Sequence, residues 1–165
     1  MAINETLKQA IKTLSQKLKG QNIEWALIGS ANLAIQGMNV KPNDIDIITS
    51  RKNISRIKQL LKEYSPALEK KQPAKTGKEW IGTDWFYELK LKINNTEVQI
   101  IGESEKDIYY SRIRKGRTLM VKIDDFDVPC QTLQAEMEAY EARKRTEKAK
   151  MIREFLAKQQ RQQHP

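Results

Sequence analysis

Two segments near the N-terminus constrain the fold most strongly. Residues 23–28 form an almost continuous apolar run, and residues 44–48 alternate aspartate with isoleucine. The first pattern suits a strand buried on both faces of a sheet, and the second suits a strand with two different faces. Residues 30–38 between them are long enough for two turns of helix and too long for a hairpin loop. The predicted order is therefore strand, turn, helix, strand, in an α/β fold.

The turn after the first predicted strand consists of Gly29 and Ser30. Glycine has no Cβ, so the backbone can turn sharply there and approach a ligand closely. Ser30 can cap the helix that follows, and the free N–H groups at such a helix start attract anions. We therefore predict that Gly29 and Ser30 bind phosphate.

The second predicted strand carries two carboxylates, Asp44 and Asp46. Residues two apart in a strand project from the same face, so these carboxylates lie side by side and repel each other. A divalent cation with a preference for oxygen ligands removes this repulsion. Phosphate at one strand end and a metal ion at the next indicate metal-dependent phosphoryl or nucleotidyl transfer.

Gly29-Ser30, followed after thirteen residues by Asp44-Ile45-Asp46-Ile47, resembles the motif of the DNA polymerase β-like nucleotidyltransferases. The resemblance covers residues 23–49 and points to a small stand-alone member with the nucleotidyltransferase fold. It implies transfer of NMP from a nucleoside triphosphate to a hydroxyl group. It also implies that Asp44 and Asp46 are catalytic and bind magnesium, or manganese in its place, while Gly29 and Ser30 hold the β and γ phosphates.

One position departs from the family pattern. Members usually have a third carboxylate on a later strand, just before a glycine, and aligning residues 98–102 with that pattern places Gln99 there. Glu97 lies two residues earlier and on the same strand face, so its longer side chain could replace the missing aspartate. Either Glu97 is the third catalytic carboxylate, or the protein binds nucleotide and metal with little turnover.

The remaining elements follow from periodicity and turn residues. Apolar spacing predicts a first helix, with Asn4 as its N-cap, and Asn94-Asn95 predicts a two-residue hairpin turn. In chain order we predict a helix over 4–19, a helix after Ser50, a surface loop over 65–79, hairpin strands over 86–93 and 96–101, a strand over 119–128 that ends at Pro129, and helices that begin at Thr132 and Thr146. This gives a short mixed sheet flanked by helices, with two further helices at the C-terminus.

Length and composition favour one nucleotidyltransferase-like domain over residues 1–158, with a frayed tail over 159–165. The chain has 165 residues, 39% of them hydrophobic, and lacks the apolar run of about 20 residues that a membrane span needs. Cys130 is the only cysteine, so we expect a protein of the reducing cytoplasm. The only histidine, His164, lies next to the last residue, which argues against histidine catalysis.

The net charge of +9 favours partners that carry phosphate. Tyr140 with Arg143 or Lys148 could face the nucleotide, or this basic helix could simply be solvated. The acceptor is not readable, and a small molecule, an RNA and a protein all remain open. Two alternatives to a working enzyme also remain: a weak or inactive nucleotide- or RNA-binding module of the same fold, and one component of a toxin-antitoxin-type pair.

Overall fold

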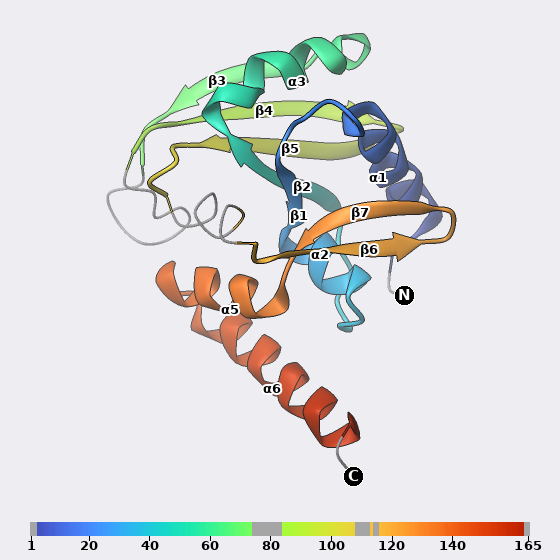
Figure 1. Ribbon diagram of the computed structural model, residues 1–165, viewed down its shortest axis with the longest axis vertical. Coiled ribbons are helices and arrows are strands. Elements are labelled where there is room, and N and C mark those ends of the chain that lie inside the picture. Colours follow the sequence, from blue (N-terminus) through green and yellow to red (C-terminus); the bar gives the residue numbers. More distant parts are fainter. Residues whose placement is uncertain (1–2, 74–83, 108–112, 114–115, 164–165) are drawn as a thin grey trace.

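The computed structural model describes residues 3–73, 84–107, 113 and 116–163. Within these residues seven strands form one mixed sheet in the order β3-β4-β5-β2-β1-β7-β6 (Figure 1). The strands are β1 (Trp25–Ile28), β2 (Asp44–Ser50), β3 (Ala67–Lys71), β4 (Phe86–Ile93), β5 (Thr96–Glu103), β6 (Thr118–Ile123) and β7 (Phe126–Gln131). The helices are α1 (Glu5–Leu18), α2 (Gly29–Ile35), α3 (Ile54–Leu60), α5 (Leu133–Ala142) and α6 (Thr146–Gln163), with 3₁₀ turns at Arg51–Asn53 and Lys62–Tyr64. The predicted mixed sheet with flanking and C-terminal helices is confirmed.

One face of the sheet is covered by α1 and α3. The apolar stripe of α1 packs with Ile54 and Ile57 of α3 and with the side chains that β2, β4 and β5 direct to that face. Asn4 caps α1 as predicted, because its Oδ1 accepts a hydrogen bond of 2.8 Å from the Leu7 N–H. These two helices cover one face of the central strands and leave the opposite face uncovered by α1 and α3.

The predicted strand, helix and strand near the N-terminus are confirmed as β1, α2 and β2. β2 lies between β1 and β5, antiparallel to the first and parallel to the second. The pairing places Ile28 opposite Asp46 on one side and Gln99 opposite Asp46 on the other. Paired residues share a face of the sheet, so Asp44 and Asp46 project away from α1 and α3.

The hairpin of β4 and β5 is also confirmed. Asn94 and Asn95 both have positive φ, 51° and 64°, which is the conformation of a type I′ turn. This tight turn sets the register, with Ile93 opposite Thr96 and Lys90 opposite Gln99.

Three predictions about secondary structure are wrong. Part of the expected loop over 65–79 is strand β3, which pairs with β4, while residues 74–83 lie outside the described residues. The expected single strand over 119–128 is the hairpin of β6 and β7, because Asp124, with φ 53°, begins a turn. Pro129 lies within β7, opposite Met120. Residues 159–163, where we expected a frayed tail, are helical.

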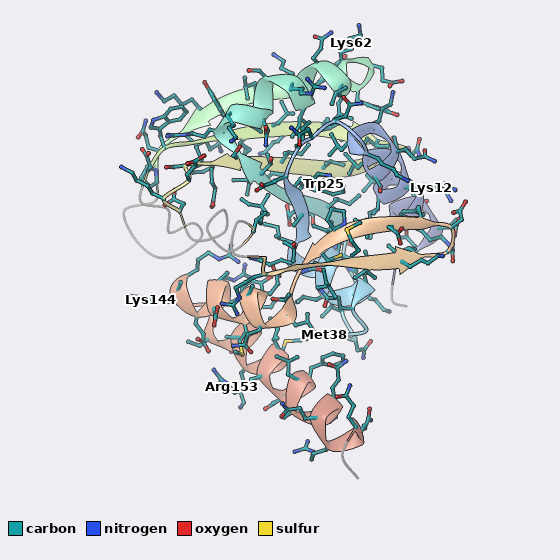
Figure 2. The ribbon with its side chains drawn as sticks, in the orientation of Figure 1. Lys12, Trp25, Met38, Lys62, Lys144 and Arg153 are labelled. Atoms are coloured by element: carbon teal, nitrogen blue, oxygen red, sulfur yellow. The ribbon has the colours of Figure 1, made fainter. Side chains whose placement is uncertain are left out.

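The two C-terminal helices pack on α2 at the edge of the sheet (Figure 1). Thr132 caps α5 as predicted, by accepting a hydrogen bond of 3.1 Å from the Ala135 N–H. Met38, which follows α2 and is labelled in Figure 2, belongs to one apolar cluster with Leu133, Tyr140 and Ile152. Ala139 of α5 joins a second apolar cluster on the face of the sheet that carries Asp46. α5 therefore borders the site.

None of the helices in the described ranges has the length and apolar character that crossing a bilayer requires.

Gly102 of β5 provides a test of this architecture. A Cβ at Gly102 would overlap Cγ1 and Cδ1 of Ile54, because α3 packs directly on the strand there. We expect Gly102→Ala to lower the free energy of unfolding by about 1–3 kcal/mol, the usual cost of overpacking. Urea unfolding measures it.

Ile54→Ala supplies the control, since alanine lacks both atoms that the added methyl group would meet. In the Ile54→Ala background Gly102→Ala should cost much less than in the wild type. An equal cost in both backgrounds would contradict the packing described here.

Candidate active site

The turn between β1 and α2 brings the predicted glycine and aspartate together. Gly29 has φ +75°, a backbone conformation that residues with a side chain rarely adopt. A Cβ at Gly29 would lie 2.9 Å from Oδ2 of Asp46, so the turn approaches the carboxylate as closely as glycine permits. The predicted proximity of Gly29 and Asp46 is confirmed.

Ser30 does not cap α2, and this expectation is wrong. The helix starts at Gly29, with Ile28 in the N-cap position, two residues before the expected cap, and has no side-chain cap. Ser30 lies inside the first turn, half-buried, and lines a cavity beside Asp46. Its hydroxyl is thus at the predicted site, but without the capping role.

Asp44 and Asp46 differ in their surroundings. Asp44 is exposed at the start of β2, whereas Asp46 is half-buried one pleat further along. Burial, and next the negative charge of Asp44, raise the pKa of Asp46 to about 6, although Arg143 acts in the opposite direction. A cation between the two carboxylates would relieve both effects. Within the described ranges no group of three or more histidine, cysteine, aspartate or glutamate side chains is arranged to hold a metal ion.

A cavity of about 470 Å³ opens beside Asp46. Its lining comes from strands β1 to β5 and from helices α2, α5 and α6, and is basic on the side of the C-terminal helices. The lining residues are Ile28, Gly29, Ser30, Asp46, Lys71, Gln72, Phe86, Glu88, Gln99, Ile101, Tyr140, Arg143, Arg145 and Lys148. Tyr140, Arg143 and Lys148 thus face the same cavity as Gly29 and Ser30, which is one of the two alternatives that the sequence left open. The guanidinium groups of Arg143 and Arg145 also lie 4.8 and 5.4 Å from the centre of the Tyr140 ring.

Glu88 is a carboxylate of this cavity that the sequence analysis missed. It lies on β4, only 5% exposed, and its Oε2 accepts a hydrogen bond of 2.5 Å from Nε2 of Gln99. Its other oxygen lies 3.4 Å from Lys71 Nζ and 3.3 Å from Lys90 Nζ. Its position could have been predicted from the Asn94-Asn95 turn. A two-residue turn pairs Glu88 with Ile101, so Glu88 lies on the same face of the sheet as Gln99.

Glu136 of α5 is a second missed carboxylate. It is 1% exposed, and its Oε2 accepts a hydrogen bond of 3.1 Å from the Gly29 N–H. Oε1 has no hydrogen-bond partner among the described residues. Burial raises the pKa of Glu136 to about 8, while the Gly29 N–H and Arg143 act to lower it. The N–H that we assigned to phosphate is therefore already bonded to a side chain.

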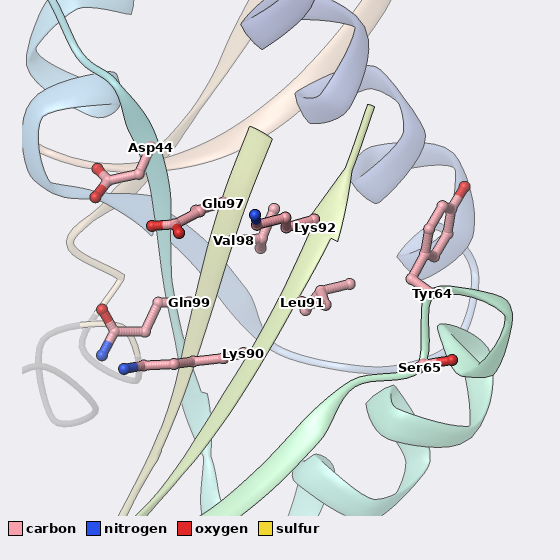
Figure 3. A pocket seen from close by; sticks show the side chains of 9 residues that line it. All are labelled: Asp44, Tyr64, Ser65, Lys90, Leu91, Lys92, Glu97, Val98 and Gln99. Carbon is pink, nitrogen blue, oxygen red and sulfur yellow. The ribbon is translucent and has the colours of Figure 1, made fainter. Parts of the chain in front are cut away.

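A second cavity, of about 520 Å³, lies next to Asp44, where β3 begins and leaves the end of β4 uncovered. Its polar lining includes Asp44, Glu97, Lys90 and Lys92, and Gln99 borders both cavities. In Figure 3 the side chains of Asp44, Glu97, Gln99 and Lys90 point to one side of the sheet, and Tyr64 lies on the other. The register places Glu97 directly opposite Asp44.

Comparison with known proteins identifies the family. The model of the aminoglycoside-2''-adenylyltransferase family matches residues 10–154. The chain belongs to this family. Adenylyl transfer is a nucleotidyl transfer, so membership supports a nucleotidyltransferase activity and implies a nucleotide substrate. Members of such families generally use a divalent metal ion.

Solved structures show the same fold. A nucleotidyltransferase structure from Thermotoga maritima, described as putative, is 24% identical with a TM-score of 0.68, covering 94% of this chain and 96% of that one. ANT(2'')-Ia in complex with adenylyl-2''-tobramycin is 10% identical, with a TM-score of 0.55 and coverage of 90% and 88%. A solution structure of ANT(2'')-Ia is 12% identical with the same TM-score, covering 90% and 83%. No curated protein sequence matched the chain significantly.

In this aminoglycoside-2''-adenylyltransferase family member, the contact between Glu136 and Gly29 predicts a pH-dependent stability. Because the pKa of Glu136 is raised from 4.5 to about 8 on folding, the folded state holds this proton to higher pH than the unfolded chain does. Stability should therefore fall as pH rises from 4.5 to 8, by at most about 1.4 kcal/mol per pH unit for one proton. Glu136→Gln removes the ionisable group and keeps an acceptor oxygen for Gly29. We expect its stability to fall less over this range in urea unfolding at several pH values.

Glu136→Ala is the matched variant, since it removes both the charge and the acceptor for the Gly29 N–H. It should be less stable than Glu136→Gln at every pH, because the half-buried Gly29 N–H is left without this partner. Parallel pH profiles for the wild type and Glu136→Gln would contradict the raised pKa.

Proposed function

We propose that this protein transfers NMP from a nucleoside triphosphate to a hydroxyl group of an acceptor, with release of pyrophosphate. The observation that carries the proposal is the placement of Asp46 against the Gly29 turn, in a cavity lined with cations. Asp46, one of the two proposed metal ligands, lines this cavity together with cationic side chains that would hold a triphosphate. Such a pairing is what nucleotidyl transfer needs, because catalysis of phosphoryl chemistry rests mainly on positioning and charge stabilisation.

The donor set fits a magnesium ion, or manganese in its place. Asp44 and Asp46 offer oxygen ligands on one face of β2, and Asp46 lies beside a second negative charge in a half-buried position. Magnesium in nucleotide sites is commonly bound by one or two carboxylates, with substrate phosphates and water completing the shell. The proposed pair therefore needs no third protein ligand. The bound ion would supply charge neutralisation at the phosphates.

The triphosphate would lie along the basic side of the cavity. We place its β and γ phosphates near Ser30 and the turn at Gly29, with Arg143, Arg145 and Lys148 of the C-terminal region around them. Since the Gly29 N–H bonds to Glu136, the phosphate contacts would come from Ser30 and the cationic side chains unless Glu136 moves. Arginine binds phosphate through two N–H groups at once, which suits this position.

A carboxylate is still needed to accept the proton of the attacking hydroxyl. The hydroxyl oxygen would bond to the α-phosphorus as the bond from that phosphorus to the pyrophosphate oxygen breaks. Two side chains compete for the role: Glu97, opposite Asp44, and Glu88, beside Asp46 and Gln99. We favour Glu88, since it is buried in the cavity and held by three polar neighbours, whereas Glu97 is exposed.

A nucleotide-binding module with little turnover is the second candidate. It is favoured by the ion pairs of Glu88 with Lys71 and Lys90, since two ammonium groups already occupy the carboxylate that would have to accept the proton. Binding without product distinguishes this candidate from an enzyme.

The aspartate pair gives the first test of the proposal. Asp44→Asn and Asp46→Asn should each lower the rate of NMP transfer about a hundredfold or more, because about 1.4 kcal/mol of lost transition-state stabilisation is tenfold in rate. Calorimetry with ATP, GTP, CTP and UTP, with magnesium and with chelator, checks the binding step. Binding that needs magnesium and is lost in the double variant is expected. If the folded variants transferred NMP at near the wild-type rate, Asp44 and Asp46 would not be the metal ligands.

Glu88→Gln and Glu97→Gln form a matched pair for the third carboxylate. Both changes remove one negative charge, and both leave a side chain of similar size. We expect Glu88→Gln to lower kcat by about a hundredfold with little change in nucleotide affinity, within the range for a lost general base. Glu97→Gln should change kcat less than fivefold. The opposite ranking would return the role to Glu97.

A further inference from the structure

The cavity next to Asp44 has no role in nucleotide binding as proposed above, although it borders one of the two aspartates. Its charged and amide side chains are Asp44, Glu97, Gln99, Lys90 and Lys92, and Tyr64, Ser65, Leu91 and Val98 complete its lining. Its volume of about 520 Å³ falls in the range of small-molecule sites, about 300–1,000 Å³. Resting on the proposed function, we propose that this cavity binds the acceptor, a small hydroxyl compound that carries a phosphate group.

The position follows from the geometry of the reaction. Attacking and leaving oxygens lie roughly in line on opposite sides of the phosphorus. If the triphosphate occupies the cavity beside Gly29 and Arg143, an acceptor must approach the α-phosphate from the other side of the aspartate pair. Asp46 lines the nucleotide cavity, Asp44 lines the other cavity and Gln99 lines both, so the two cavities meet at the aspartate pair.

The charge of the cavity selects the kind of acceptor. Once Asp44 is engaged by a metal ion, Glu97 is the remaining carboxylate of the lining, against Lys90 and Lys92. Lys92 is exposed and forms no ion pair with any residue that the structure describes, and the Lys90 side chain is 62% exposed beside its contact to Glu88. Lys90 and Lys92 lie on the same face of β4, opposite Gln99 and Glu97. Two adjacent ammonium groups suit a phosphate dianion.

The same charges argue against a polycationic acceptor. The ANT(2'')-Ia structure contains adenylyl-2''-tobramycin, and aminoglycosides carry several protonated amino groups. Such a ligand needs carboxylates around it, yet with Asp44 engaged by a metal ion Glu97 is the one carboxylate left among the described lining residues, against two lysines. The net charge of +9 would also repel a polycation at a distance. We therefore expect the acceptor of this protein to differ from the aminoglycoside in the name of the family.

The test compares acceptors that differ only in the phosphate. Glycerol 3-phosphate and glycerol are titrated into the ¹⁵N-labelled protein, with tobramycin as the polycation, and binding is located from amide shifts. Magnesium and a non-hydrolysable ATP analogue with an α,β-methylene bridge are added first, so that the nucleotide cavity is filled. We expect glycerol 3-phosphate to shift amides of residues 90–99 and to bind at least tenfold more tightly than glycerol or tobramycin.

Lys92→Glu should weaken glycerol 3-phosphate binding at least tenfold. Lys122→Glu is the matched control, because this exposed lysine lies on β6 at the opposite edge of the sheet, and it should leave binding within twofold. Tighter binding of tobramycin, equal binding of glycerol and its phosphate, or equal effects of the two variants would overturn the inference. Shifts confined to residues 143–148 would also overturn it. If the ATP analogue fails to bind, the proposed function falls, while the same titrations without nucleotide still decide the acceptor site.

Discussion

The pairing of β2 with β1 on one side and β5 on the other is the constraint on which the site depends. Backbone hydrogen bonds place Ile28, Asp46, Gln99 and Lys90 in one row across four strands. A shift of one residue would turn Asp46 into the layer of α1 and α3, where isoleucine and leucine side chains are buried. The apolar side chains on that face therefore fix the carboxylates on the other.

The C-terminal helices complete the cavity that begins at the sheet beside Asp46. α5 packs Ala139 against the carboxylate-bearing face and extends Glu136 to the Gly29 N–H. A buried carboxylate is costly unless it is protonated or bonded, and the raised pKa of Glu136 reflects that cost. A helix from the far end of the chain thus holds the backbone N–H of a turn near its start. The site is coupled to the docking of α5 rather than confined to the sequence motif.

Most of this fold could be predicted from local patterns. Asn4 and Thr132 act as helix caps, Asn94-Asn95 forms a tight turn, and alternation in residues 44–48 places both aspartates on one face. β3 could not be predicted, because residues 67–71 are mostly exposed edge residues without an apolar alternation. Glu136 was also out of reach, since its contact with Gly29 spans 107 positions and depends on how α5 docks. Helices, strands and turns could thus be predicted from neighbouring residues, whereas contacts between elements far apart in the sequence are known only from the structure.

Gln99 and Glu88 are best understood together. An aspartate at position 99 would place a second negative charge against buried Glu88, and the two carboxylates would repel each other. Glutamine instead donates a hydrogen bond to Glu88 and removes the repulsion. The departure from the family pattern on β5 therefore accompanies a carboxylate on the neighbouring strand β4. Glu88 thus offers a carboxylate one strand away from Gln99, on the same face of the sheet as Asp46, and glutamine at position 99 does not by itself argue against a working site.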